Sequence, residues 1–149
     1  MNYRHAFHAG NFADVHKHVV LLALLERLKQ KPKPLLYLDT HAGRGSYDLR
    51  AEDAMRSGES REGIARLAGH PVRSADLLRY LQATHAASTT PTRYPGSPLI
   101  ALGALREGDR AVLVEQQPAE AQALQQATSR MRDVSIVCGD LYGDRKSVV

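Results

Sequence analysis

Aromatic residues and cysteine are scarce in this sequence. Its 149 residues include no Trp, two Phe, six Tyr and one Cys. A single cysteine cannot form a disulfide within the chain, so a fold held together by internal disulfides is excluded. The hydrophobic core must instead consist mainly of Leu, Val, Ala and Ile, and we expect Cys138 to be buried as a small hydrophobic residue.

Long hydrophobic segments and targeting signals are absent as well. The longest apolar run, residues 19–25, is too short to cross a bilayer. The first ten residues carry Arg4, His5 and His8 and lack the apolar region of a signal peptide. We therefore expect a cytoplasmic protein with no membrane partner, and the length predicts one domain. The net charge of +4 is compatible with a nucleic-acid partner but does not require one.

The sequence also lacks the short motifs of several enzyme classes. It contains no G-x-x-x-x-G-K-[ST] loop and no complete G-x-G-x-x-G fingerprint, which gives little support to ATP or NAD as a ligand. Four histidines near the N-terminus suggest a metal, but no H-E-x-x-H or C-x-x-C accompanies them. His16 and His18, two residues apart, would not share a face of a helix. We therefore predict no metal site.

A pattern of helices and buried strands is present. Apolar residues at helical spacing predict a first helix over residues 12–30, capped by Asn11 or Asp14. The apolar run 35–38, ended by Asp39, predicts a strand that is buried on both faces, as in a parallel sheet.

Residues 46–92 interrupt this pattern. They are polar, and two stretches within them, 62–68 and 74–87, have helical character. We interpret the segment as an inserted helical subdomain, because it lacks the Gly/Ser monotony of a flexible linker. Ser97 is predicted to cap the next helix, with Pro98 in its first position. The elements predicted after the insertion are helix 97–106, strand 111–115, helix 118–130 and strand 134–138.

Polar residues follow each of the three predicted strands. Asp39 ends the first strand, Glu115 the second, and Asp140 comes after the third. Open α/β sheets bind ligands outside the carboxyl ends of their strands, where these residues would converge. The glycine-bearing turn 41–45 would let a ligand approach the backbone. Glu115 can accept hydrogen bonds from both hydroxyls of a ribose, and Asp140 can accept one from the exocyclic amine of adenine. The pattern favours a nucleoside ligand.

Three motifs resemble those of one bacterial family. The sequence is YRHAFHAGNFADVHKH over residues 3–18, YLDTHAG over 37–43 and YPGSP over 94–98. All three are similar to signatures of the 23S rRNA adenine-N6 methyltransferases, a family with a relative described as involved in the use of external DNA. The resemblance extends to about residue 142 and corresponds to the N-terminal half of the family's proteins.

The resemblance implies an enzyme that uses S-adenosylmethionine to methylate the exocyclic amine of one adenine in its partner, 23S rRNA. The implied fold is α/β and Rossmann-like, with a helical insertion after the first strand, and it is truncated after the third strand. Residues 1–45 and 93–143 would form the N-terminal part of the methyltransferase domain, residues 46–92 the insertion and residues 144–149 an atypical tail.

The resemblance also assigns functional residues, position by position. Leu141 departs from the family, which usually has Gly there, although a backbone contact would survive the change. Tyr3 would contact the RNA, with Lys17 nearby. No catalytic residue is assigned, because the family's Asp-Pro-Pro-Tyr or Asp-Pro-Pro-Phe motif does not occur in the 149 residues. The cofactor contacts implied by the resemblance are His18, His41, Ser97, Glu115, Asp140 and Leu141.

The absence of a fourth strand would have a physical consequence. Residues 35–38 would form an exposed apolar edge, and we expect a marginally stable chain without catalytic activity. Two other functions remain open at this point. One is a non-catalytic module that binds nucleic acid or nucleosides, and the other is a metal-dependent hydrolase built on the histidines.

Overall fold

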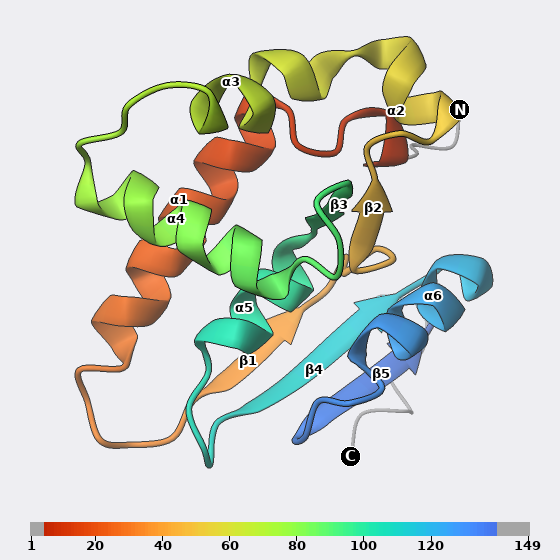
Figure 1. The fold of residues 1–149 in the computed structure, drawn as a ribbon. Coiled ribbons are helices and arrows are strands. Elements are labelled where there is room, and N and C mark those ends of the chain that lie inside the picture. Colours follow the sequence, from red (N-terminus) through yellow and green to blue (C-terminus); the bar gives the residue numbers. More distant parts are fainter. Residues whose placement is uncertain (1–4, 140–149) are drawn as a thin grey trace.

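The computed structural model describes residues 5–139 and contains a parallel sheet of three strands (Figure 1). The strands are β1 (Leu36–Asp39), β4 (Arg110–Glu115) and β5 (Val134–Cys138), in the spatial order β1-β4-β5. Tyr37 lies opposite Ala111, and Val112 lies opposite Ser135. Each strand is found where the sequence predicts it, and all three carboxyl ends lie at one edge of the sheet.

Two helices cover one face of this sheet. They are α5 (Ser97–Ala104) and α6 (Pro118–Thr128). Side chains alternate between the faces of a strand, and Ala111 and Leu113 point toward the helices. They form a buried cluster with Leu124 of α6, against which Tyr37 of β1 also packs. This cluster is the core that supports the carboxyl ends of β1 and β4.

Helix α1 (Phe12–Leu28) packs beside α5 and α4 (Ala75–Ala87). Its N-cap is Asn11, whose side chain accepts a hydrogen bond from the backbone N–H of Asp14 at 2.9 Å. The contact with its neighbours is made by Leu22, Tyr80 and Ile100, all of them buried. The predicted first helix is confirmed, and Asn11 rather than Asp14 caps it.

The other face of the sheet departs from the prediction that β1 is buried on both faces. Leu36 is 65% exposed and Leu38 is 52% exposed, while Tyr37 between them packs against the helices. Within residues 5–139, no strand pairs with the outer edge of β1 and no helix covers these two leucines. Among the described residues, β1 therefore has an unpaired outer edge and an exposed apolar face.

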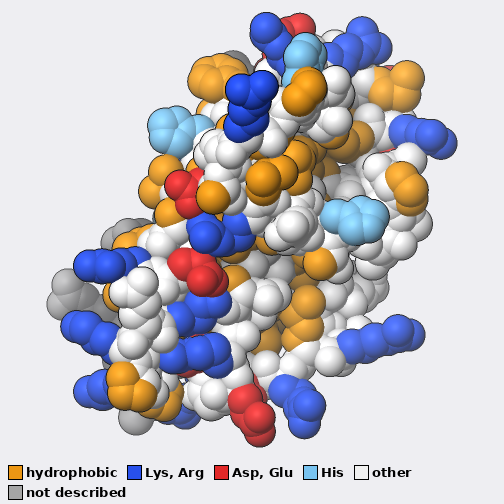
Figure 2. All heavy atoms as spheres, turned by 60° about the vertical axis from the view of Figure 1, so that its left-hand side comes forward, with side chains coloured by type: hydrophobic (Ala, Val, Ile, Leu, Met, Phe, Trp, Pro, Cys, Tyr) orange, Lys and Arg blue, Asp and Glu red, His pale blue; other side chains and the backbone are white. Residues whose placement is uncertain are grey.

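Helix α1 also exposes apolar side chains, which lie four or eight residues apart along one stripe. Its exposed members are Phe12, Val20, Leu24 and Leu28. Figure 2 brings the α1 side of the molecule forward and shows hydrophobic side chains at the surface among Lys and Arg side chains. None of the helices between residues 5 and 139 combines the length and apolar character that crossing a bilayer requires.

The segment between β1 and α5 contains two strands that the sequence did not predict. β2 (Ser46–Asp48) and β3 (Arg93–Pro95) pair antiparallel, with Tyr47 opposite Tyr94. At three residues each, they are too short to show an alternating pattern. The remaining elements are η1 (His5–Phe7), α2 (Glu52–Ser57), η2 (Glu59–Glu62) and α3 (Ile64–Ala68). The pairing of β2 with β3 brings together the two ends of the segment that contains α2, η2, α3 and α4.

Two predicted side-chain placements are wrong. The cap of α5 is Gly96, whose backbone is extended, and Ser97 is the first helical residue, with its hydroxyl turned to Asp39. Cys138 is exposed rather than buried, because it ends β5 at the edge of the sheet.

The two faces of the sheet should respond differently to the same truncation. We expect Leu113→Ala to lower the free energy of unfolding by about 2–5 kcal/mol, because it empties a buried position. Leu38→Ala should cost less than about 1 kcal/mol, because its side chain already faces solvent. Urea unfolding followed by circular dichroism measures both. Equal losses would contradict this assignment of the two faces.

Candidate functional site

Asp39 ends β1, and its carboxylate accepts hydrogen bonds from three groups. One oxygen accepts from the hydroxyls of Tyr37 at 2.9 Å and Ser97 at 3.0 Å, and the other accepts from the backbone N–H of His41 at 3.1 Å. Burial raises the pKa of Tyr37, and the negative charge of Asp39 raises it further, so this phenol remains a donor. Asp39 therefore fixes the start of α5 beside the end of β1.

The glycine turn after β1 meets the end of β4 at Glu115. The backbone N–H of Gly43 donates to Oε2 of Glu115 at 2.8 Å, and that of Gln117 donates to Oε1 at 2.7 Å. Gly43 has a φ of +67°, and a Cβ atom there would lie 2.5 Å from the hydroxyl oxygen of Tyr47. A carboxylate offers about four acceptor positions, so Glu115 is oriented by the protein and can still accept from a ligand.

His18 lies on α1 and is buried, with 4% of its surface exposed. Its Nδ1 is 2.9 Å from the hydroxyl of Tyr94, which is in turn 3.0 Å from the hydroxyl of Tyr80. Burial lowers the pKa of His18 to about 4, against the smaller opposing effect of the Asp14 charge. The imidazole is therefore neutral at physiological pH and can act as a hydrogen-bonding group rather than a cation.

Asp14 is the most buried charged residue near the N-terminus, with 1% of its surface exposed. Its carboxylate accepts from His5 Nε2 at 2.9 Å and from the backbone N–H of Gly10 at 3.0 Å, and it pairs with Lys17 Nζ at 3.0 Å. Burial raises the pKa of this carboxyl, but His5, Lys17 and the Gly10 N–H together lower it to about 2. Asp14 is therefore a permanent anion that holds two basic side chains.

These contacts connect most of the predicted site residues. Ser97 and His41 are both bound to Asp39, and the N–H of Gly43, two residues after His41, is bound to Glu115. His18 joins this group through Tyr94, which lies three residues before Ser97. The charges of both Asp14 and Asp39 act on the pKa of His18. Ser97, His41 and Glu115 thus lie at the carboxyl ends of β1 and β4, and His18 is close enough for the charge of Asp39 to act on its pKa.

The other predicted site residues have different placements. Lys17 lies on α1 beside Asp14, and its side chain is 63% exposed. Tyr3, Asp140 and Leu141 lie outside the described residues. Their roles, like those of the other site residues, stay predictions.

The histidines near the N-terminus do not converge on a metal site. His5 contacts Asp14, His8 contacts Glu59 and His18 contacts Tyr94. Between residues 5 and 139, no three or more His, Cys, Asp or Glu side chains are grouped in a way that could hold a metal ion. The described residues therefore provide no ligand set for the metal-dependent hydrolase alternative.

The sequence reasoning missed three contributors to this site. The spacing Asn11-x-x-Asp14 is that of a helix capping box, and it could have indicated that Asp14 turns back toward the preceding backbone. Tyr80 gave no local signal, and Tyr94 was noted only as the first residue of the motif at 94–98. Their contact joins a helix to a strand whose place in space depends on the β2-β3 pairing.

A parallel sheet with a glycine turn at its carboxyl end defines a mixed α/β protein, consistent with a Rossmann-like methyltransferase fold. The model of one protein family, described as Ribosomal RNA large subunit methyltransferase D, RlmJ, matches residues 32–149. The chain belongs to this family.

Curated relatives and a solved structure agree with this membership. The Ribosomal RNA large subunit methyltransferase J of Escherichia coli (strain K12) is 50% identical over 122 residues, covering 80% of this chain and 44% of that protein. The protein of the same name from Haemophilus influenzae is 39% identical over 152 residues, covering 100% and 54%. A crystal structure of a Legionella pneumophila protein is similar with a TM-score of 0.76 at 38% identity, covering 86% and 48%. The chain spans about half the length of the curated relatives it matches.

The buried neutral His18 predicts a specific pH dependence of stability. Its pKa is about 4 in the fold and 6.5 when exposed, so the unfolded chain binds an extra proton between these values. Stability should therefore fall as the pH drops from 6.5 toward 4, by up to about 3 kcal/mol. Urea unfolding at a series of pH values measures this slope, which His18→Gln should flatten. His16→Gln, on the exposed side of the same helix, is the control, and an unchanged slope in His18→Gln would refute the assignment.

Proposed function

We propose that this chain provides the S-adenosylmethionine-binding half of a methyltransferase that modifies an adenine of large-subunit rRNA at N6. The observation that carries the proposal is the convergence of Ser97, His41 and Glu115 at the carboxyl ends of β1 and β4 in a chain of this family. Ligands of open α/β sheets bind at this edge. In this interpretation, residues 46–92 are an insertion into the methyltransferase domain, and the protein acts in the cytoplasm.

The residues at this edge fit the proposed cofactor. Gly43, whose missing side chain leaves room for the Tyr47 hydroxyl, places its backbone N–H against Glu115, and Glu115 is held with acceptor positions to spare for ribose hydroxyls. His18, His41 and Ser97 would line the same site, and Asp140 and Leu141 would complete it. When bound, S-adenosylmethionine supplies the methyl group that is transferred. The task of the protein residues is to hold the cofactor and orient it.

The RNA side of the proposed function rests on the opening segment. Lys17 is exposed beside Asp14, close to the buried His18, and Tyr3 begins the same motif. A lysine can neutralise a phosphate and a tyrosine ring can stack on a base, which are the two contacts that a single-stranded RNA needs. Lys17 and Tyr3 are therefore proposed to bind the rRNA substrate next to the cofactor.

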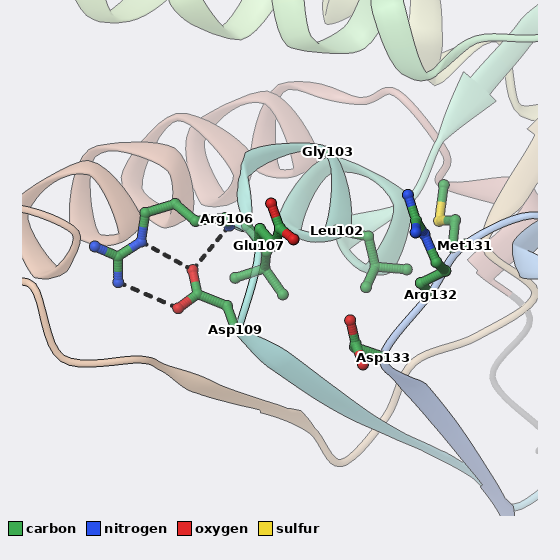
Figure 3. Close-up of a pocket in the computed structure, with 9 residues that line it drawn as sticks. Leu102, Gly103, Arg106, Glu107, Asp109, Met131, Arg132 and Asp133 are labelled. Atoms are coloured by element: carbon green, nitrogen blue, oxygen red, sulfur yellow. Dashed lines mark hydrogen bonds and ion pairs between the residues drawn. The ribbon is translucent and has the colours of Figure 1, made fainter.

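A Glu115→Gln variant tests the proposed cofactor site. The amide keeps the size of the side chain but can accept from only one of the two backbone N–H groups of Gly43 and Gln117, and it loses the charge that ribose hydroxyls would meet. We expect the affinity for S-adenosylhomocysteine, measured by calorimetry, to fall at least about tenfold. The control is Glu107→Gln, an exposed position after α5 at the opposite end of the sheet (Figure 3). An equal response of the two variants, or no binding by the unmodified chain, would refute the proposed cofactor site.

Methyl transfer tests the catalytic part of the proposal. Because the family's Asp-Pro-Pro motif does not occur in these 149 residues, we expect the chain to bind the cofactor without transferring its methyl group. Incubation with labelled S-adenosylmethionine and rRNA should leave the RNA unlabelled, while the Escherichia coli relative serves as the active comparison. Labelled RNA in the reaction with the 149-residue chain would show that other residues supply the chemistry.

A further inference from the structure

We propose that Asp14 is a positioning residue for substrate RNA, which holds Lys17 and His5 in the arrangement that contacts the RNA backbone. This inference rests on the RNA-binding role of Lys17 in the proposed function. It assigns to a buried carboxylate, which cannot touch the RNA itself, the task of orienting the side chains that can.

The carboxylate of Asp14 contacts both the backbone before α1 and two basic side chains. Oδ2 accepts from the backbone N–H of Gly10 and from His5 Nε2, and Oδ1 faces Lys17 Nζ at 3.0 Å. The first of these contacts belongs to the start of α1 and stabilises the helix. The contact with His5 joins η1 to α1, whereas the contact with Lys17 is an ion pair within α1.

Asp14 and Lys17 differ in burial, and this difference indicates how the ion pair would assist RNA binding. Asp14 is almost completely covered, whereas the side chain of Lys17 is 63% exposed. A lysine on a helix surface loses side-chain entropy when it is fixed by a ligand. The buried carboxylate restricts Lys17 before RNA arrives, while leaving the remaining ammonium protons free to donate to a phosphate.

Residues 59–64 also contact the residues that lie between η1 and α1. Glu59 of η2 accepts from His8 Nδ1 at 3.0 Å and from Asn11 Nδ2 at 2.9 Å, and the N–H of Ile64 donates to the carbonyl of Gly10 at 2.8 Å. The turn that carries His5 is therefore anchored at both ends. Asp14 is the anchor that also contacts a cation on α1.

The charge of Asp14 allows a test in which positioning and simple electrostatics predict opposite results. Asp14→Asn keeps an acceptor for the Gly10 N–H but removes the negative charge that holds Lys17. Loss of a negative charge by itself should strengthen binding to any RNA. If Asp14 positions Lys17, binding to the substrate RNA should weaken instead.

The experiment compares the affinity of the full 149-residue chain for protein-free large-subunit rRNA and for poly(U). We expect Asp14→Asn to weaken binding to the rRNA about three- to tenfold and to leave poly(U) binding unchanged or stronger. Lys17→Met should weaken rRNA binding by a similar factor. In the double variant, Asp14→Asn should add little to the effect of Lys17→Met, because the two residues act as one unit.

The matched control is Asp109→Asn at the opposite end of the sheet. Asp109 is also buried and has its pKa lowered to about 2, chiefly by its hydrogen bond with Arg106 (Figure 3). It therefore undergoes the same chemical change and the same change in net charge, away from the proposed RNA site. Circular dichroism establishes that each variant is folded at the temperature of the binding measurement.

Each outcome decides the proposal. Weaker rRNA binding in Asp14→Asn but not in Asp109→Asn, together with the non-additive double variant, supports it. If the two Asp→Asn variants behave alike, or if the double variant shows additive losses, Asp14 is a helix-start residue without a positioning role. If the unmodified chain binds rRNA no better than poly(U), the proposed RNA-binding function fails first, and the positioning role fails with it.

Discussion

The carboxylate of Asp39 joins parts of the chain that are far apart in the sequence, and the arrangement of the residues at the carboxyl ends of β1 and β4 depends on it. Ser97 is 58 residues away from Asp39, yet its hydroxyl donates to this carboxylate. The same group orients the backbone at His41, from which the glycine turn continues toward Glu115. Because Tyr37 stays protonated and donates as well, the carboxylate is satisfied without a cation. The hydrogen bonds from two hydroxyls and one backbone N–H stabilise this anion among the described residues.

A second polar network joins three elements in the helical part of the molecule. His18, Tyr94 and Tyr80 come from α1, β3 and α4, and their hydrogen bonds are buried. A buried polar group left without a partner costs about 1–3 kcal/mol, so each of these elements is constrained by the other two. The helices between β2 and β3 therefore take part in the buried hydrogen-bond network. One of them, α4, contributes Tyr80, which contacts the tyrosine that binds His18.

The sequence predicted the parts of this structure that have a local cause. Helix α1, the three parallel strands and helices α5 and α6 follow from the spacing of apolar residues and from caps and prolines. The strands β2 and β3 could not be predicted, because three residues show no period and their pairing joins distant segments. The placement of Ser97 failed for a related reason. Its hydroxyl could either cap α5 or bind Asp39, and which of the two occurs depends on the tertiary structure.

Residues 8–11, which precede α1, pack closely against residues 59–64 of the segment after β2. A Cβ atom at Gly63 would lie 2.0 Å from the carbonyl oxygen of Gly10, a separation that no side chain can tolerate. That carbonyl accepts the N–H of Ile64, and Glu59 binds Asn11, the cap of α1. The position of α1, and with it that of His18 and Lys17, therefore depends on contacts with residues 57–64. If the opening motif contacts RNA as proposed, this segment determines where that motif lies relative to the cofactor, without having to touch either ligand.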